Sequence, residues 1–267
     1  MNVHLPDTDL SVIARSGQCF RLRTLGENRW RLLTRNHCTE AELLSDGKTR
    51  FSCTEEEFHT IWAEYLDLST DYNAICALAD PEDLFLQQAI EYGKGLRLLR
   101  QEPWEMLVTF ILSQRKNIPA IQKCVEALCC LCGEPIPGWG EHAFPTPRAI
   151  LSQSPEALAA CGMGYRLPYI RGTAAMLAEG WPEGIETLSG DALEKWLLAF
   201  PGVGSKVAAC VMLFGFHQLD AFPRDVWIQR VEARFYNGRF PTENYPGYAG
   251  VMQQYLFFYS QSTGLKE

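Results

Sequence analysis

The chain has 267 residues, of which 47% are hydrophobic and 21% are charged, with a formal net charge of −8 at pH 7. This composition is typical of a globular protein and excludes a disordered or fibrous chain. The longest apolar stretch, 207–216, is about half the length needed to cross a membrane, and the first ten residues lack a secretory pattern. We therefore expect a cytoplasmic protein without a membrane partner, whose ten cysteines are reduced thiols.

The negative net charge is unfavourable for a protein that coats nucleic acid, because phosphate binding depends on lysine and arginine. Basic residues are nevertheless dense in three stretches, 94–100, 115–123 and 206–234. We expect these stretches to form a local basic strip on an acidic body.

The first part of the chain has the pattern of antiparallel strands. Short apolar runs between residues 10 and 53, such as 19–25 and 30–34, are separated by Gly, Asn and Asp. Thr54 follows, with Glu57 three residues later and an apolar periodicity behind it, which predicts a capping box that begins a helix.

Helical patterns dominate after this point. Apolar spacing and prolines at first turns predict helices over 81–92, 103–113, 118–131, 147–151, 155–161, 167–179, 191–199, 205–216, 226–236 and 248–260. The predicted fold class is therefore α+β, with an N-terminal antiparallel β-sheet domain over residues 1–90 and a mostly helical region over residues 91–267.

The most informative segment is a Pro-Gly-Val-Gly turn between two apolar helices, at 197–210. Gly202 and Gly204, with Val203 between them, allow the backbone to approach another molecule closely. The helix that follows offers unpaired N–H groups and the positive end of its dipole, so the turn is suited to hold a phosphate. The alternative is an ordinary helix–turn–helix corner, which also needs a glycine.

Lys206 lies in the first turn after this hairpin, and Asp225 begins a later helix. Taken singly, each residue has an ordinary structural explanation: Lys206 as a solvent-exposed lysine on a helix, and Asp225 as the N-cap of a helix. Together they resemble the helix-hairpin-helix (HhH-GPD) superfamily of DNA glycosylases, in which L-P-G-V-G-x-K is followed by an aspartate at this spacing. The resemblance implies that Lys206 is the nucleophile, which forms a Schiff base with the sugar, and that Asp225 stabilises positive charge on the sugar as the base leaves.

Four further segments resemble the bacterial type of the 8-oxoguanine DNA glycosylase/AP lyase branch: SGQCFR at 16–21, GLRLLRQEPWE at 95–105, GMGYR at 162–166 and YAGVMQQYLF at 248–257. The resemblance implies that the carbonyl of Gly17 accepts the N7 hydrogen of 8-oxoguanine. Gln253 and Phe257 lie one helical turn apart, so an amide can read the base edge while a ring stacks on the base. Cys210 matches members that place a thiol against the base; as a lone cysteine it is equally suited to a helical core.

The resemblance also implies contacts with DNA outside the base pocket. Tyr165 matches a tyrosine that wedges into the base stack, and Arg166 matches an arginine that faces the orphaned partner base. The eukaryotic pattern carries three asparagines where this chain has two basic residues, at 115 and 116, before Asn117. Either Gln114 or Arg115 is therefore expected to fill the gap left by the flipped base.

Three departures from the family are visible in the sequence. Ala120 replaces an arginine that helps to read the opposite cytosine, so we expect Arg166 to act alone and the preference for cytosine to be weaker. Trp227 stands where many relatives have histidine. No cysteine follows Cys210, which excludes the four-cysteine iron–sulfur cluster of one subgroup.

The resemblance therefore predicts a DNA N-glycosylase with AP-lyase activity that flips 8-oxoguanine out of double-stranded DNA and excises it in base excision repair. We expect the hairpin at about 191–216, a base pocket completed by the C-terminal helix, a monomer, a location at the bacterial nucleoid, and no required cofactor or metal site. A structural monovalent or divalent cation at the hairpin is left open. Two alternatives remain. A glycosylase for alkylated purines would not need Lys206, Gly17 or Gln253. A noncatalytic DNA-binding module would not need the pair Lys206 and Asp225.

Overall fold

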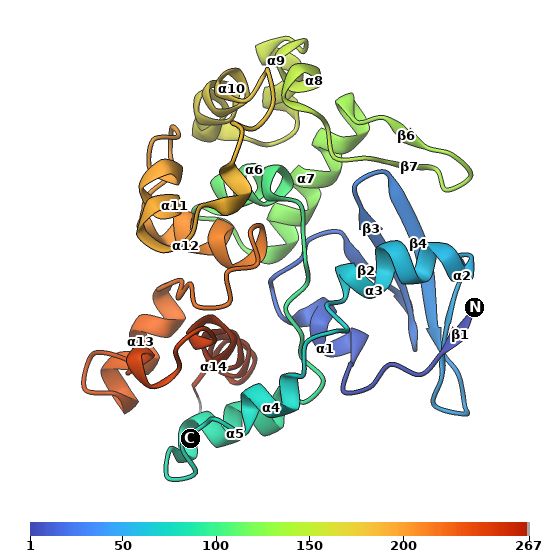
Figure 1. Cartoon of the computed structure of the whole chain (residues 1–267). Helices are drawn as coiled ribbons and strands as arrows, with labels where there is room; N and C mark the ends of the chain where they lie inside the picture. The colour runs from blue at the N-terminus through green and yellow to red at the C-terminus, as the bar shows by residue number, and fades with distance from the viewer. Residues whose placement is uncertain (266–267) are drawn as a thin grey trace.

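The computed structural model describes residues 1–265 and has an antiparallel sheet beside a larger helical body, which confirms the α+β class (Figure 1). The sheet is five-stranded, in the order β1-β5-β4-β3-β2. Its strands are β1 Asn2–Val3, β2 Leu22–Gly26, β3 Arg29–Thr34, β4 His37–Leu43 and β5 Thr49–Phe51. All neighbouring pairs are antiparallel.

A short helix interrupts the region for which strands are predicted. Helix α1, Leu10–Arg15, begins at Asp9, whose carboxylate accepts hydrogen bonds from the backbone N–H groups of Ser11 and Val12. The strand prediction is wrong over these six residues. So short a helix shows too little apolar periodicity to be told from a strand by pattern alone.

The capping box at Thr54 is confirmed. The Thr54 hydroxyl accepts from the backbone N–H of Glu57, and the Glu57 carboxylate accepts from the backbone N–H of Thr54. The helix that it begins consists of α2 Glu55–Glu57, a π-helical segment η1 Phe58–Trp62, and α3 Ala63–Tyr65.

The helical body follows. Its α-helices are α4 Tyr72–Cys76, α5 Leu84–Tyr92, α6 Pro103–Ser113, α7 Ile118–Cys132, α8 Pro147–Leu151, α9 Pro155–Ala160, α10 Leu167–Met176, α11 Gly190–Leu197, α12 Ser205–Phe214, α13 Val226–Phe235 and α14 Ala249–Thr263. Three 3₁₀ turns join them within the described chain: η2 Gly164–Arg166, η3 Ile185–Thr187 and η4 Thr242–Asn244. Every helix expected from the sequence is present, with its ends shifted by a few residues.

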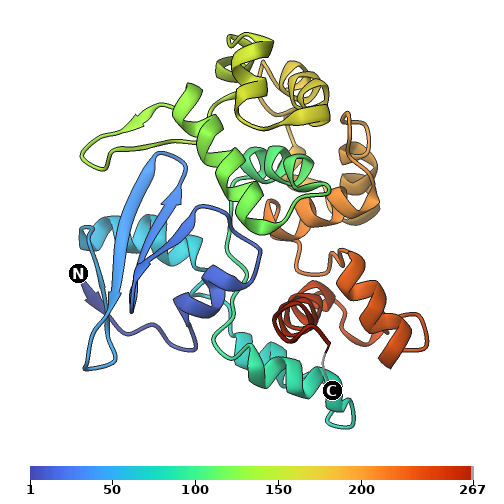
Figure 2. The ribbon, with the colours of Figure 1, turned by 180° about the vertical axis from the view of Figure 1, so that it is seen from behind.

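These helices form two groups (Figure 2). In one, α6 packs against α7 and α12, with α8 to α10 beyond them; in the other, α14 packs against α5 and α13. Helix α5 thus groups in space with the C-terminal helices, although most of it lies within residues 1–90, the expected N-terminal domain. Among the described residues, no helix is long and apolar enough to span a membrane.

A small hairpin after α7 reaches back to the sheet (Figure 1). Its strands, β6 Pro135–Ile136 and β7 Glu141–His142, pair antiparallel, and Ile136 packs against Leu33 and Cys38 of the sheet. The sequence indicated only a Gly/Pro-rich loop here, because two-residue strands carry no periodic signal.

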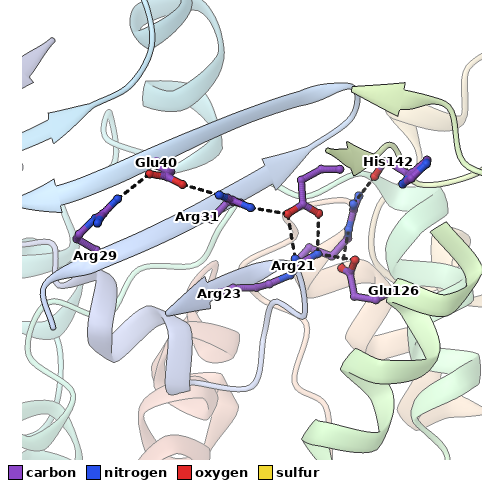
Figure 3. Close-up of polar contacts among 8 residues, drawn as sticks. Arg21, Arg23, Arg29, Arg31, Glu40, Glu126 and His142 are labelled. Atoms are coloured by element: carbon purple, nitrogen blue, oxygen red, sulfur yellow. Dashed lines mark hydrogen bonds and ion pairs between the residues drawn. The ribbon is translucent and has the colours of Figure 1, made fainter. Parts of the chain in front are cut away.

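An ion-pair network fastens the sheet to the helical body (Figure 3). Glu141 of β7 accepts from Arg23 of β2 at 3.0 Å and from Arg31 of β3 at 2.8 Å. Arg21, which is fully buried, pairs with Glu126 of α7 at 3.3 Å and also donates to the carbonyl of His142. Because these contacts join β2, β3, β7 and α7, they fix the segment before β2 relative to the helices.

In the basic stretch at 94–100, one of the two arginines expected on a surface strip is buried. Arg97 is buried and donates to the carbonyls of Asp67 and Thr70, at 2.8 and 3.0 Å. Arg100 pairs with the Asp67 carboxylate at 2.8 Å, and His217 lies 3.1 Å from the same carboxylate. Burial alone would raise the pKa of Asp67, but the hydrogen bonds from His217 and Arg100 lower it to about 2.

Candidate active site

The hairpin between α11 and α12 is shaped by two glycines with different roles. Gly202 has φ +76°, and a β-carbon there would lie 2.5 Å from the ring of Tyr169, so the fold itself requires glycine. Gly204 is exposed, and a β-carbon there would meet nothing within 4 Å. Its backbone is therefore open to the close approach of another molecule at the start of α12.

Lys206 is in the first turn of α12 and is half-buried. Its Nζ lies 5.7 Å from the centre of the Phe110 ring on α6. One turn later, Cys210 is buried, and burial raises the pKa of its thiol to about 11 although the Lys206 amine opposes the shift. The thiol beside Lys206 is therefore neutral at physiological pH.

Asp225 is the N-cap of α13, as the sequence suggested. Its Oδ1 accepts hydrogen bonds from the backbone N–H groups of Trp227 and Ile228, both at 2.9 Å. Burial raises the pKa of this carboxyl, while the two backbone bonds and Lys206 oppose the shift. The cap fixes the orientation of a carboxylate that faces the same cavity as Lys206.

A cavity of about 390 Å³ lies between the two helical groups, lined by residues of α6, α7, α12, α13, α14 and the segment before β2. Its lining includes Lys206, Cys210 and Asp225 together with Gly17, Gln253 and Phe257. The structure therefore brings together all the residues predicted for catalysis and the base pocket. The volume and the largely apolar, aromatic lining suit a flat aromatic ligand.

Gln253 is the most informative group in the cavity wall. Gln253 is only 3% exposed, and its Nε2 donates to the carbonyl of Pro223 at 3.1 Å. Its Oε1 is buried without a hydrogen-bond partner among the described residues. An unsatisfied buried acceptor costs about 1–3 kcal/mol, so this oxygen is poised for a donor from a bound molecule.

The Gly17 turn is held against α14. Gly17 has φ +76°, and a β-carbon there would lie 3.1 Å from the Phe257 ring. The carbonyl of Ser16 accepts from Gln254 Nε2 at 2.7 Å, and the buried Gln18 amide bonds to the backbone of residues 97 and 99. The polar residues of the 16–21 motif therefore hold the turn, and its glycine leaves room for Phe257.

The residues predicted to contact DNA outside the pocket differ in exposure. Tyr165 is 51% exposed, and Arg115 is exposed with φ +53°. Arg166 is only 6% exposed and donates to the carbonyls of Gln114 and Met163.

The remaining two candidates in the α6–α7 loop also make internal contacts. Gln114 Nε2 donates to the carbonyl of Gly202 at 3.0 Å, and Asn117 caps α7 through the N–H of Ala120 at 3.0 Å. Asn117 also lines the cavity. The DNA contacts of all these side chains stay predictions.

Sequence reasoning did not assign Lys116, Trp227 or Gln261 to the pocket, yet all three line it. Gln261 could have been found, because it continues the spacing of Gln253 and Phe257 along one face of a helix. Lys116 had no such signal, since a lysine in a loop has no periodicity to indicate its direction. No group of three or more His, Cys, Asp or Glu side chains in residues 1–265 could hold a metal ion.

Comparison with known families divides the chain into two matches. Residues 1–107 match the N-terminal domain of 8-oxoguanine DNA glycosylase, and residues 108–244 match the HhH-GPD superfamily of base excision DNA repair proteins. The chain is 32% identical to a probable N-glycosylase/DNA lyase of Methanothermobacter thermautotrophicus, over 69% of each protein. It is 36% identical to the N-glycosylase/DNA lyase of Saccharomyces cerevisiae over 54% of this chain, which covers 42% of the yeast protein.

The fold agrees with solved structures. The Clostridium acetobutylicum 8-oxoguanine glycosylase/lyase in complex with DNA containing cytosine opposite 8-oxoguanine has a TM-score of 0.89 at 28% identity, over 99% of both chains. The 3-methyladenine DNA glycosylase of Archaeoglobus fulgidus has a TM-score of 0.75 at 18% identity over the whole of both chains, which shows a common fold alone. The chain belongs to the HhH-GPD superfamily of base excision DNA repair proteins, and its first 107 residues are an N-terminal domain of the 8-oxoguanine DNA glycosylase type.

Proposed function

We propose that the protein is a bifunctional DNA glycosylase and AP lyase that excises 8-oxoguanine from double-stranded DNA. The observation that carries this proposal is the unpaired Oε1 of Gln253 in the same cavity as Lys206 and Asp225. A guanine-type base presents N–H donors at N1 and N2, whereas an adenine-type base presents an acceptor at N1. A buried acceptor oxygen therefore favours a guanine-type base that has been flipped into the cavity.

The chemistry follows from the placement of the two catalytic groups. The N-glycosidic bond breaks as a bond forms between Lys206 Nζ and C1′ of the sugar, and the base leaves with a proton. Asp225 stabilises the positive charge that develops on the sugar. Cleavage of the C1′–O4′ bond then gives the Schiff base, and loss of a C2′ proton expels the 3′ phosphate.

The alternative functions lack comparable support. A noncatalytic DNA-binding module has no use for a cavity of about 390 Å³ that contains Lys206 and Asp225. A glycosylase for alkylated purines has no use for the lysine or for the acceptor on Gln253.

On the DNA-facing surface, Arg115 is the better candidate to fill the gap left by the flipped base. Its side chain is exposed, whereas the Gln114 amide nitrogen donates to the carbonyls of Ile111 and Gly202. We further expect a monomer at the bacterial nucleoid that needs no cofactor, with a structural cation at the hairpin carbonyls left open.

Borohydride trapping on an 8-oxoguanine duplex tests the function. The wild-type protein should form a covalent adduct, and Lys206→Gln should abolish both the adduct and base release while it retains DNA binding, because the hairpin supplies the affinity. Lys195→Gln, at an exposed lysine of α11, is the matched control and should trap like the wild type. Trapping that persists in Lys206→Gln would exclude Lys206 as the nucleophile.

A panel of duplexes extends this test to the substrate. Release of 8-oxoguanine should exceed release of guanine, adenine and 3-methyladenine. Preferential release of the methylated base would refute the proposed substrate while leaving the fold assignment intact.

A further inference from the structure

An indole and a guanidinium lie together at the rim of the cavity. Trp227, in the first turn of α13, is half-buried and lines the cavity, whereas Arg230, one turn later, is exposed. The guanidinium carbon of Arg230 lies 5.1 Å from the centre of the Trp227 ring. The indole therefore connects the wall of the cavity to a cation outside it, and we call these two side chains the rim pair.

Arg230 has no polar partner in the described part of the chain, where it forms no ion pair and donates no hydrogen bond. The neighbouring arginines are occupied. Arg224 forms an ion pair with a buried glutamate of α13 at 3.0 Å, and Arg234 donates to the carbonyl of Leu265 at 3.0 Å. All five N–H donors of Arg230 are therefore available to a bound molecule, and the contact with the indole limits the directions in which they point.

The charge of Arg230 also acts on a catalytic group. Asp225 caps the same helix, and Arg230 opposes the rise in its pKa that burial causes. The other titratable groups that face Asp225 are Lys206 and Cys210, both of α12. Since no ion pair joins Arg230 to Asp225 in residues 1–265, Arg230 lies near the site of the reaction without being neutralised by the carboxylate.

The rim of the cavity is also where the phosphates of a bound strand have to lie. A base that has entered the cavity keeps its sugar beside Lys206 and Asp225, so the phosphates on either side of that sugar stay outside. A guanidinium suits a phosphate because its N–H donors match two oxygens at once. Contact with an aromatic ring holds the guanidinium in place beforehand, so that less side-chain entropy is lost on binding.

We propose that Trp227 and Arg230 form a phosphate-binding site at the rim of the cavity, in which Arg230 binds a backbone phosphate next to the extruded nucleotide and Trp227 orients the guanidinium. The inference rests on the proposed function. It gives a role to Trp227, one of the positions at which the chain departs from many relatives. With the open backbone at Gly204, the site provides two separate contacts for the DNA backbone.

The salt dependence of DNA binding tests the site. The probe is a duplex that carries a tetrahydrofuran analogue of an abasic site, which has no base, so a change in base recognition cannot alter the result. Each phosphate contact contributes about 0.9 to the slope of log Kd against log salt concentration. Arg230→Met should therefore make the slope shallower by about 0.9 and weaken binding at low salt by about 10-fold or more.

Variants of Trp227 test the orienting role of the indole. Trp227→Leu should also make the slope shallower, although Arg230 is still present, because the guanidinium is no longer held in place. Trp227→Tyr keeps an aromatic face and should keep the wild-type slope. Adding Trp227→Leu to Arg230→Met should change the slope little further, since both substitutions remove the same phosphate contact.

Arg234→Met is the matched control. Arg234 lies one turn further along α13, is exposed and has its guanidinium carbon 5.2 Å from the centre of the Phe235 ring, but it already donates to a carbonyl. The variant removes the same charge from the same helix and should leave the slope unchanged. A second measurement separates the two arginines: Arg230→Met alone should move the acidic limb of base release to higher pH, because a charge that lowers the pKa of Asp225 is lost.

The outcomes separate the rim pair from the proposed function. Failure of the wild-type protein to release 8-oxoguanine would refute the proposed function. An unchanged slope in Arg230→Met, or equal changes in Arg230→Met and Arg234→Met, would refute the phosphate site. A wild-type slope in Trp227→Leu would refute the orienting role; if thermal unfolding shows that this variant does not fold, Trp227→Met, which keeps an unbranched apolar side chain, takes its place.

Discussion

The cavity and the junction between sheet and helices use charge in opposite ways. In the junction, Glu141 pairs with Arg23 and Arg31 (Figure 3), and although burial opposes the shift, these arginines lower the pKa of the carboxyl. In the cavity, burial raises the pKa of Asp225, and the described structure contains no ion pair between Asp225 and Lys206. The junction neutralises its charges to fasten two parts of the protein, whereas the cavity keeps its lysine and aspartate apart and available to a substrate.

After the complete loss of activity expected for Lys206→Gln, the largest effect comes from removing the charge at Asp225. Asp225→Asn should slow single-turnover base release by about 10²- to 10³-fold, since a charge that stabilises the transition state is lost. Thermal unfolding should change little, because asparagine caps helices as well as aspartate does. A loss of stability large enough to explain the lost rate would reduce Asp225 to a structural cap.

The same substitution should alter the pH profile. Catalysis needs the ionised carboxylate, so the wild-type rate should fall as the pH drops through a pKa that burial holds above the ordinary value. This acidic limb should be absent in Asp225→Asn. Ionisation of Asp225 has the opposite effect on the stability of the fold. Because the pKa of this carboxyl is raised in the folded state, its contribution to the free energy of unfolding decreases as the pH rises.

The next effect concerns two neighbouring glutamines of α14: Gln253, whose buried Oε1 has no hydrogen-bond partner among the described residues, and Gln254, whose Nε2 donates to the carbonyl of Ser16. Gln253→Met should reduce release of 8-oxoguanine by about 10- to 100-fold, since one base contact is worth roughly 1–3 kcal/mol. Its thermal stability should fall little, because the lost bond to Pro223 is offset by removal of an unsatisfied acceptor.

Gln254→Met is the matched control for that variant. Gln254 donates to the carbonyl of Ser16 at 2.7 Å, so its loss should lower the unfolding free energy by about 1–3 kcal/mol. Equal losses of stability in the two variants would contradict the distinction between a ligand-reading and a structural glutamine.

The smallest effect on catalysis is expected in the junction. Glu141→Gln should lower the unfolding free energy at pH 7 by about 1–2 kcal/mol, a value reduced for the partial exposure of both arginines. The rate per folded molecule should stay within about twofold of wild type. Because the folded pKa of Glu141 is lowered, the stability that it supplies is present above its ordinary pKa and is lost as the pH falls through the lowered folded pKa; in denaturant titrations, the difference between wild type and variant should therefore be smaller at pH 4 than at pH 7.

The sequence predicted those features that depend on local signals. The capping box at Thr54 and the helices that begin with proline are encoded within a few residues, and the hairpin with Lys206 and Asp225 is a contiguous pattern. The sequence also predicted which side chains share the cavity, through the family resemblance. These predictions succeeded because the identity and spacing of the residues carried them.

What the sequence could not predict was the direction and burial of individual side chains. Arg97 is a surface cation by composition, but it is buried among carbonyl oxygens. Arg166 is assigned to the partner base by its motif, yet it is buried and bonded to Gln114. Such contacts depend on residues distant in sequence, which no local pattern encodes.

The hydrogen bond between Gln254 and Ser16 joins residues 238 positions apart, nearly the whole length of the chain. During synthesis, a chain that has emerged only as far as Asp225 already holds the hairpin and the nucleophile but lacks α14, which supplies Gln253 and Phe257 to the cavity. The apolar wall of the cavity is then exposed to solvent, and a chain in this state is prone to aggregate. Contacts of such long sequence separation also form slowly. The ability to recognise a base is therefore acquired only when synthesis is almost finished, and an incomplete chain that carries the reactive lysine has no site in which to hold a base.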